Sequence, residues 1–321
     1  MSGVIMINGV NKHKLGNLLR SVRESKSMTQ SDVRKLVGIS EATLRRIENG
    51  ENLPSIATIE GLTNAYKVDV LKMYTKLRTI NAYERFYEKL DDLLINYDVD
   101  KLKNIYKSFN DFIKENSDEY FDLKEQEQYK LVLKGLEIYY NDQSSVKASS
   151  ELYKKALRLR YEDFSLDNYM NYDYNHIELK ALYSLAMNAC VEMKYLEANA
   201  IFEFIVGLEK DDKTKVETTD RSKIHIKALL NIAYNYFCLD DMDKSLDYID
   251  RGLEKCKEIK TYYLMHALFY RKAVALFLQN KEASFYEDYF RKSFMMLEIQ
   301  GSYELLDKYK EITRDRYGIE F

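Results

Sequence analysis

The sequence predicts an all-α fold in two parts, a small N-terminal head over residues 12–79 and a longer body over residues 80–321. The first observation is a scarcity of helix breakers, because one Pro and eleven Gly in 321 residues are too few for strands joined by tight turns. The second is that apolar residues recur three and four places apart. The third is a register of large and small side chains that repeats along the body and predicts stacked helix pairs.

Composition and charge limit the class of protein. With 46% hydrophobic and 31% charged residues, the chain can bury a core and lacks the composition of a disordered protein. Residues 1–80 hold thirteen Lys and Arg against seven Asp and Glu, a balance of +6, whereas the whole chain carries −3 and the remainder therefore −9. A basic head on an acidic body indicates that only the head meets a polyanion.

The sequence favours a cytoplasmic protein that does not enter a membrane. The three cysteines, Cys190, Cys238 and Cys256, are odd in number and show no CxxC spacing, which suits a reducing compartment. The N-terminus has only a four-residue apolar run before polar residues, which is too short for a secretion signal. No apolar run approaches the length of a membrane span.

Three short helices are predicted at the start of the head. Apolar residues recur at helical spacing from Leu15 onward. Thr29 is an N-cap with Asp32 three places on, a weaker form of the capping box, and Gly38 can take the left-handed conformation that ends the second helix. Ser40 caps the third helix. The side chains expected to face the core are Leu15, Leu18, Leu19, Val22, Val33, Leu36, Val37, Leu44 and Ile47.

Two short helices joined by a Gly-containing turn describe a helix-turn-helix. Residues 15–71 resemble the Xre-type helix-turn-helix domain of phage repressors, through "MTQSDVRKLVGISEATLRRIENGENLPSIATIEGLTNAYKVDVLKM". The resemblance implies that Gln30 holds a DNA phosphate and that Arg23 and Glu48 form a structural ion pair. It also implies a third helix that faces base edges with Glu41, Ala42 and Arg46, with Arg45 beside them, and contacts the DNA backbone with Ser40, Thr43 and Asn49.

Two of these side chains have base-reading chemistry of their own. Arg46 can present a bidentate donor fork to guanine, worth roughly 1–3 kcal/mol of discrimination, and Glu41 can accept a hydrogen bond from cytosine. A carboxylate near phosphates is repelled unless it finds a donor, so the base read by Glu41 stays open. The alternative is a head that only binds protein, and the +6 balance favours DNA.

The joint between head and body is expected to be helical. Between Gly61 and Gly135 there is no Gly and no Pro, and "VLKMYTKLRTINAYERFYEKLDDLL" carries helix-forming residues through the boundary near residue 79. A flexible tether has a different composition. Movement in the body could then change how two heads are spaced.

The body repeats one pattern of side chains. "ALYSLAMNACVEMKYLEANAIFEFIVGLE" from Ala181 aligns with "ALLNIAYNYFCLDDMDKSLDYIDRGLE" from Ala228, and a third copy starts near Phe269. Two large residues, a small one and a large one, followed by a small residue opening the next helix, suit two tightly crossing helices. The pattern resembles tetratricopeptide repeats and predicts a solenoid of about five helix pairs, with a terminal cap in "SYELLDKYKEITRDRYGIEF".

Such a solenoid places the first helix of each pair on its concave surface. Asn188 and Asn235 occupy the same register there, and Asn231 lies one turn before Asn235. A carboxamide can donate to one peptide group and accept from the next, so these residues can hold an extended backbone. The full set expected to bind a peptide is Asn188, Asn231, Asn235, Tyr183, Met187, Lys180, Lys227, Tyr234 and Tyr270, with the lysines facing a carboxylate. The alternative is that the asparagines fill gaps between helices.

A head of this type on a body of this type is similar to the peptide-pheromone receptors of Gram-positive bacteria, the family grouping Rap, Rgg, NprR, PlcR and PrgX. The resemblance implies a homodimeric transcription regulator of operator DNA, controlled by a short hydrophobic signalling peptide. The alternative is a regulator whose body binds a protein partner. No phosphate-binding loop, GxGxxG or HExxH is present, so no enzyme, cofactor or metal site is expected, and a phosphatase-like signalling protein is the least favoured class.

Overall fold

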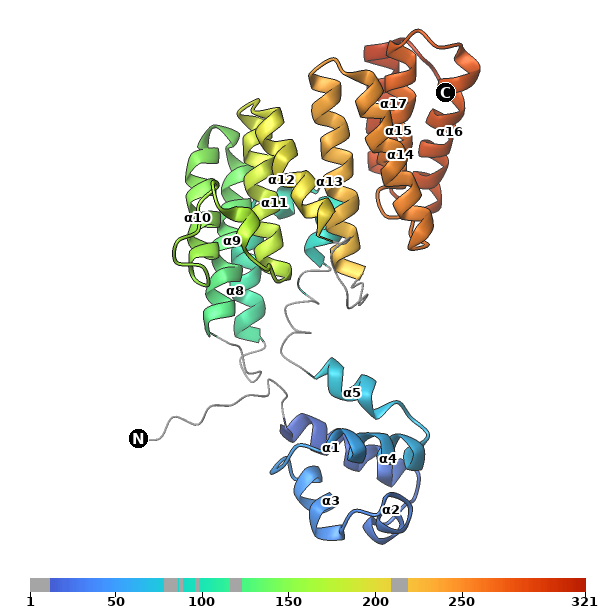
Figure 1. Cartoon of the computed structure of the whole chain (residues 1–321). Helices are drawn as coiled ribbons and strands as arrows, with labels where there is room; N and C mark the ends of the chain where they lie inside the picture. The colour runs from blue at the N-terminus through green and yellow to red at the C-terminus, as the bar shows by residue number, and fades with distance from the viewer. Residues whose placement is uncertain (1–11, 78–85, 87–88, 96–97, 116–122, 209–218) are drawn as a thin grey trace. The chain divides into compact units, whose positions relative to one another are not determined.

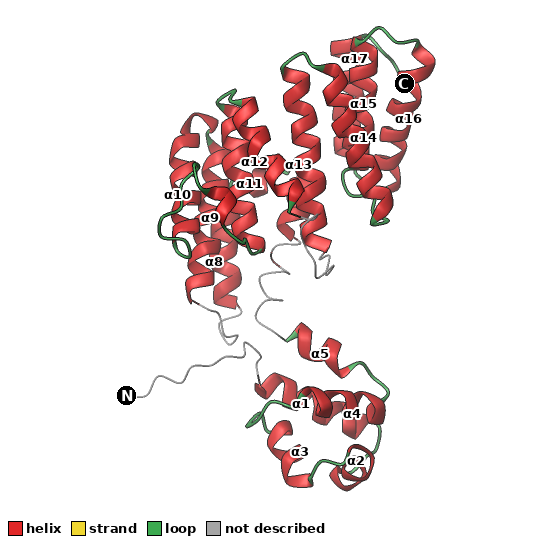
Figure 2. Cartoon of the chain, viewed as in Figure 1, coloured by secondary structure: helices red, strands yellow, loops and turns green. Residues whose placement is uncertain are grey.

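The structure is a computed structural model of the whole chain and describes residues 12–77, 86, 89–95, 98–115, 123–208 and 219–321. Every regular element in these ranges is a helix, which confirms the all-α prediction (Figure 2). The chain forms two compact units, residues 1–91 with 108–126 and residues 92–107 with 127–321, and each is described by itself. The boundary between residues 79 and 80 remains a prediction.

Five helices make up the described part of the head. They are α1 (Lys12–Ser25), α2 (Gln30–Val37), α3 (Glu41–Glu48), α4 (Ile56–Tyr66) and α5 (Val70–Lys76) (Figure 1). Both bonds of the capping box at Thr29 and Asp32 are present. Gly38 has a φ of 78° and ends α2, and the Ser40 side chain caps α3 by accepting from the Thr43 amide. The predicted start and end of α2 and the predicted start of α3 are therefore confirmed.

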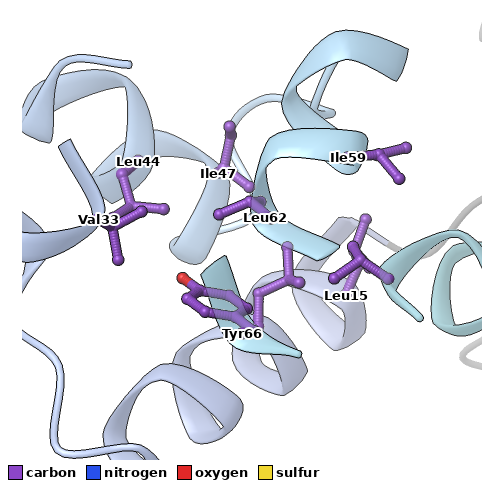
Figure 3. Close-up of a cluster of buried hydrophobic side chains, with 9 residues drawn as sticks. Leu15, Val33, Leu44, Ile47, Ile59, Leu62 and Tyr66 are labelled. Carbon is purple, nitrogen blue, oxygen red and sulfur yellow. The ribbon is translucent and has the colours of Figure 1, made fainter. Parts of the chain in front are cut away.

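The head is held together by one apolar cluster that all five helices enter (Figure 3). Its buried members are Leu15, Leu19, Val33, Leu44, Ile47, Ile59, Leu62, Tyr66 and Val70. The prediction was wrong for Leu36, which is 65% exposed, and for Leu18, which is 37% exposed. The eight-residue helix α2 turns Val33 and Val37 to the cluster, and Leu36 lies about 100° around the helix from Val37.

The predicted helix through the joint is not continuous from α5. This helix ends at Lys76, because the Leu77 amide bonds to the Tyr74 carbonyl three residues back, the tightened pattern of a helix end. Residues 78–85, where most of the predicted joint falls, lie outside the described ranges.

The described part of the body includes four successive helix pairs and a terminal helix. The pairs are α9 (Leu123–Asn141) with α10 (Val146–Arg158), α11 (His176–Val191) with α12 (Tyr195–Gly207), α13 (Thr219–Cys238) with α14 (Met242–Glu258), and α15 (Met265–Leu278) with α16 (Ala283–Ile299). The predicted cap forms α17 (Tyr303–Tyr317). Before these pairs come α7 (Val99–Leu102) and α8 (Ile105–Glu115). The short 3-10 turn η1 (Gln143–Ser145) adjoins α10, and a second one, η2 (Tyr169–Asn171), precedes α11. The expected first pair, residues 83–115, lies partly outside the described residues.

Small residues set the crossings within the pairs, as the repeated register predicts. Ala233 on α13 and Ser245 on α14 are buried, and the Ser245 hydroxyl donates to the Ala233 carbonyl at 2.9 Å. Helix α11 packs on α13 and α13 packs on α15, whereas α12, α14 and α16 approach one another less closely. Helices α11, α13 and α15, the first helices of their pairs, thus form one layer, which we call the inner layer.

Candidate DNA and peptide interfaces

Helix α3 presents an exposed polar edge above a buried base. Leu44, Ile47 and Glu48 are buried, and Ser40 fixes the first turn by capping it. The other predicted DNA-contacting residues of this helix and its ends all lie at the surface: Ser40, Glu41, Ala42, Thr43, Arg45, Arg46 and Asn49. A helix anchored on one face and polar on the other can enter a groove of DNA without rearranging its own fold.

A buried ion pair supports that helix, as the resemblance implied. Arg23 donates to Glu48 through Nε at 2.6 Å and through Nη2 at 3.0 Å. Gln30 Nε2 donates to the same carboxylate at 2.9 Å. Burial acts to raise the pKa of Glu48, but the hydrogen bonds from Arg23 and Gln30 and the Arg23 charge outweigh it and lower that pKa. Glu48 is therefore a carboxylate that joins α1, α2 and α3.

The network also orients Gln30, the predicted phosphate contact. Gln30 is half-buried, and its bond to Glu48 fixes the amide at the start of α2. The second amide hydrogen and the carbonyl oxygen remain for a ligand. An amide held in this way can meet a phosphate at a defined position relative to α3.

Glu41 has the donor that a carboxylate needs near DNA. Arg34 Nη1 lies 3.8 Å from Glu41 Oε1, and both side chains are exposed. The pairing offsets the negative charge without burying it, so the Glu41 carboxylate can still accept from a base. The guanidinium groups of Arg45 and Arg46 make no ion pair with a residue in the described ranges.

The side chains predicted to contact the DNA backbone at either end of α3 also form local hydrogen bonds within the protein. Ser40 Oγ and Thr43 Oγ1 lie 2.8 Å apart. Asn49 accepts from Arg20 Nη2 at 2.6 Å and donates to Glu51 at 3.0 Å. These polar groups are exposed and oriented by the protein before any ligand arrives.

In the body, two of the three predicted asparagines lie between helices. Asn188 is 3% exposed, and its amide donates to the Val146 carbonyl at 3.1 Å and to the Ser150 hydroxyl at 2.9 Å. Asn235 is fully buried, where it donates to Asn199 Oδ1 at 2.7 Å and accepts from Cys190 Sγ. Both residues are buried between helices, as the alternative expects, and their contact with a peptide remains a prediction.

The third asparagine lies closer to the surface of the inner layer. Asn231 Nδ2 donates to the Tyr183 hydroxyl at 2.7 Å and to the Lys227 carbonyl at 2.8 Å. Asn231, Tyr183 and Met187 are half-buried, and Tyr234 is 37% exposed. These four side chains come from α11 and α13, so the structure brings them to one surface.

Two of the remaining predicted contacts are less accessible. Lys180 is 7% exposed and Tyr270 is 8% exposed. Lys227 is half-buried, with Nζ 5.6 Å from the centre of the Tyr263 ring. Sequence reasoning missed Arg271, whose guanidinium lies 4.1 Å from the centre of the Tyr234 ring. The one feature of the sequence that pointed to Arg271 was its position directly after Tyr270 in the third repeat.

Known proteins share the head. A family of helix-turn-helix domains matches residues 14–72. The ImmF control region 10 kDa protein of Bacillus phage phi105 is 36% identical over 76 residues, which are 22% of this chain and 83% of the phage protein. The chain belongs to the helix-turn-helix family.

Solved structures share the fold over most of the chain. Bacillus thuringiensis PlcR, in complex with the peptide PapR7 and DNA, has a TM-score of 0.68 at 17% identity, covering 92% of this chain and 99% of PlcR. The Streptococcus dysgalactiae SHP pheromone receptor Rgg2 has a TM-score of 0.56 at 14% identity, covering 94% and 99%. ComR from S. thermophilus, in complex with DNA and its signalling peptide ComS, has 0.54 at 16% identity, covering 92% and 97%.

At these identities the likeness shows the fold. It confirms the predicted architecture, a helix-turn-helix domain followed by a tetratricopeptide-like solenoid. None of the described helices combines the length and apolar character needed to cross a membrane. The same ranges contain no group of three or more His, Cys, Asp or Glu residues that could hold a metal ion.

Proposed function

We propose that this protein is a cytoplasmic transcription regulator that binds a roughly two-fold operator as a homodimer. The observation that carries the proposal is the exposed polar edge of α3, set on a buried ion pair in a head of charge +6. Two heads related by a two-fold axis would each place one α3 in a major groove.

In this proposal the side chains of α3 divide by role. Arg46 reads a guanine, Glu41 reads a cytosine with Arg34 beside it, and Ala42 packs against a base edge. Contacts to the DNA backbone come from Gln30, Ser40, Thr43 and Asn49, with Arg45 adding charge.

A selection from random-sequence DNA with the full chain tests this assignment. We expect a recovered site made of two inverted half-sites, each with a guanine whose replacement weakens the wild-type protein but not Arg46→Ala. Recovery of sequences with no shared motif would reject the operator proposal and leave a head that binds DNA without preference, or a protein-binding module.

We also propose that the inner layer binds a short hydrophobic peptide. Support comes from the fold shared with PlcR over 92% of this chain and from the surface formed by Tyr183, Met187, Asn231 and Tyr234. Asn231 can exchange its bond to Tyr183 for a bond to a peptide group at little cost, because both side chains are half-buried. Asn188 and Asn235 support this surface from beneath.

A peptide that binds two states of the body with different affinity shifts the equilibrium between them and so changes DNA affinity. To find the ligand, the full chain is immobilised and exposed to the small-peptide fraction of spent culture medium, and retained peptides are identified by mass spectrometry. We expect one apolar peptide to be retained by wild type and lost with Asn231→Ala plus Tyr234→Ala. Retention of no peptide, together with retention of a protein from the cell extract, would favour the protein-partner alternative.

A further inference from the structure

An aromatic ring and two arginines come from two successive helices of the inner layer and from the terminal helix α17, which contacts α15. Tyr234 comes from α13, Arg271 from α15 and Arg316 from α17. The Arg271 guanidinium stacks 4.1 Å from the centre of the Tyr234 ring. A guanidinium held over a ring face by a cation–π contact can still donate hydrogen bonds from its N–H groups.

Helix α17 is fixed against α15 at this point. The Tyr270 hydroxyl lies 3.1 Å from Thr313 Oγ1, and the Tyr270 and Tyr309 rings are 4.3 Å apart. Arg316 follows Thr313 by three residues, so it is on the same side of α17 as the contact with α15. The pKa of the Tyr234 and Tyr270 hydroxyls is raised, mainly by burial, and the positive charges of Arg271 and Arg316 act in the opposite direction.

The two arginines also lack the partners that their neighbours have. Lys272 pairs with Asp250 and Arg314 pairs with Asp315. Neither Arg271 nor Arg316 forms an ion pair with any carboxylate in the described ranges. The remainder of the chain after residue 80 carries −9, so acidic side chains for such pairs are abundant. Two guanidinium groups that have no ion-pair partner among the described residues, on an acidic body, therefore favour an external anion.

We propose that Arg271 and Arg316 form a carboxylate-binding subsite for the peptide ligand, with Tyr234 as the platform that orients Arg271. This inference rests on the proposed peptide-binding function. A guanidinium fork matches a carboxylate in two parallel hydrogen bonds, and the stacking on Tyr234 removes much of the side-chain freedom that binding would otherwise cost. The carboxylate can belong to the C-terminus of the peptide or to an acidic side chain.

Three libraries of randomised apolar heptapeptides distinguish these sources. The first has a free C-terminus and no acidic residue, the second has an amidated C-terminus and one Asp or Glu, and the third is amidated with no acidic residue. Retention on the immobilised full chain is measured for wild type, Arg271→Gln and Arg316→Gln. We expect wild type to retain the first or the second library over the third, and each variant to reduce that retention about tenfold.

Arg251→Gln is the matched control. Arg251 stacks on Tyr248 at 4.3 Å, nearly the geometry of Arg271 on Tyr234, but both lie on the outer helix α14. It should leave retention unchanged. Arg271→Lys, which keeps the charge and loses the fork, should retain peptides between wild type and Arg271→Gln. If Arg271→Gln unfolds in circular dichroism, the exposed Arg316→Gln carries the test alone.

The outcomes separate this inference from the function on which it rests. Equal retention of all three libraries by wild type, or carboxylate-dependent retention that survives both Gln variants, rejects the subsite and leaves peptide binding intact. Retention of none of the three libraries by wild type rejects peptide binding and the subsite with it.

Discussion

The head and the body both bury polar side chains beneath their candidate sites. Only in the body were those buried side chains predicted to touch the ligand themselves. In the head, Arg23 and Glu48 are buried and the residues that would touch DNA stand above them on α3. In the body, Asn188 and Asn235 were themselves the expected contacts, and the structure buries them between helices. A polar residue that recurs in the sequence can therefore lie beneath a binding site or contact the ligand, and the exposed fraction of its side chain distinguishes the two roles.

The largest effect is expected from breaking the support in the head. Glu48→Ala leaves Arg23 buried without its partner, and removing one member of such a pair costs about 3–5 kcal/mol. Denaturant unfolding of the full chain, recorded with a signal that reports on the head, measures the loss in unfolding free energy. The control Glu24→Ala removes an exposed carboxylate 3.5 Å from the same arginine and should cost well under 1 kcal/mol. Similar costs for the two variants would mean that Glu48 does not support the head.

Next comes the packing between α1 and α3. A Cβ on Gly16 would lie 2.5 Å from the Ile47 carbonyl oxygen and 2.6 Å from that of Glu48, so Gly16→Ala must push α3 away. We expect a loss of about 3 kcal/mol and weaker operator binding. Gly207→Ala on α12 is the matched control, because nothing lies within 4 Å of its added Cβ, and it should be neutral or stabilising. Operator affinity that Gly16→Ala leaves intact would show that α3 does not depend on α1.

How much the sequence could predict follows from the same contrast. The capping residues and Gly38 were predictable, because each acts within a few residues of the chain, whereas the Arg23–Glu48 pair, 25 residues apart, was implied by the family resemblance. The pairing of body helices was predictable because small residues recur at the crossings. The depth of Asn235 was not, because it depends on Asn199 and Cys190, which belong to other helices. Arg271 was missed for the same reason, since its partner Tyr234 lies in another repeat.

A smaller effect separates support from contact in the body. Asn235→Ala leaves Asn199 without its donor inside the protein and should cost about 2 kcal/mol of unfolding free energy. Asn231→Ala, at a half-buried position one turn earlier, should cost less than half of that but remove more peptide affinity. Denaturant unfolding and peptide titration of both variants test these two expectations. A stable Asn235→Ala protein that no longer binds peptide would mean that Asn235 contacts the peptide.

The smallest effect is a change of base preference in the head. Arg46→Ala should lose about tenfold in the ratio of operator to random-DNA affinity, because a base contact is removed while phosphate contacts remain. Gln30→Ala should weaken both affinities alike, since Gln30 is assigned to a phosphate. Fluorescence anisotropy at two salt concentrations measures both. An Arg46→Ala loss that is equal on operator and random DNA would place Arg46 on a phosphate.

The central claim is that a peptide on the inner layer controls DNA binding by the head. The most direct test is the anisotropy of labelled operator DNA titrated with the full chain, with and without the retained peptide. We expect the midpoint to shift with wild type, to stay fixed with the Tyr234→Ala, Asn231→Ala double variant, and to shift normally with the outer-layer control Arg251→Gln. A midpoint that the peptide leaves unchanged in wild type, despite measured peptide binding, would contradict the claim.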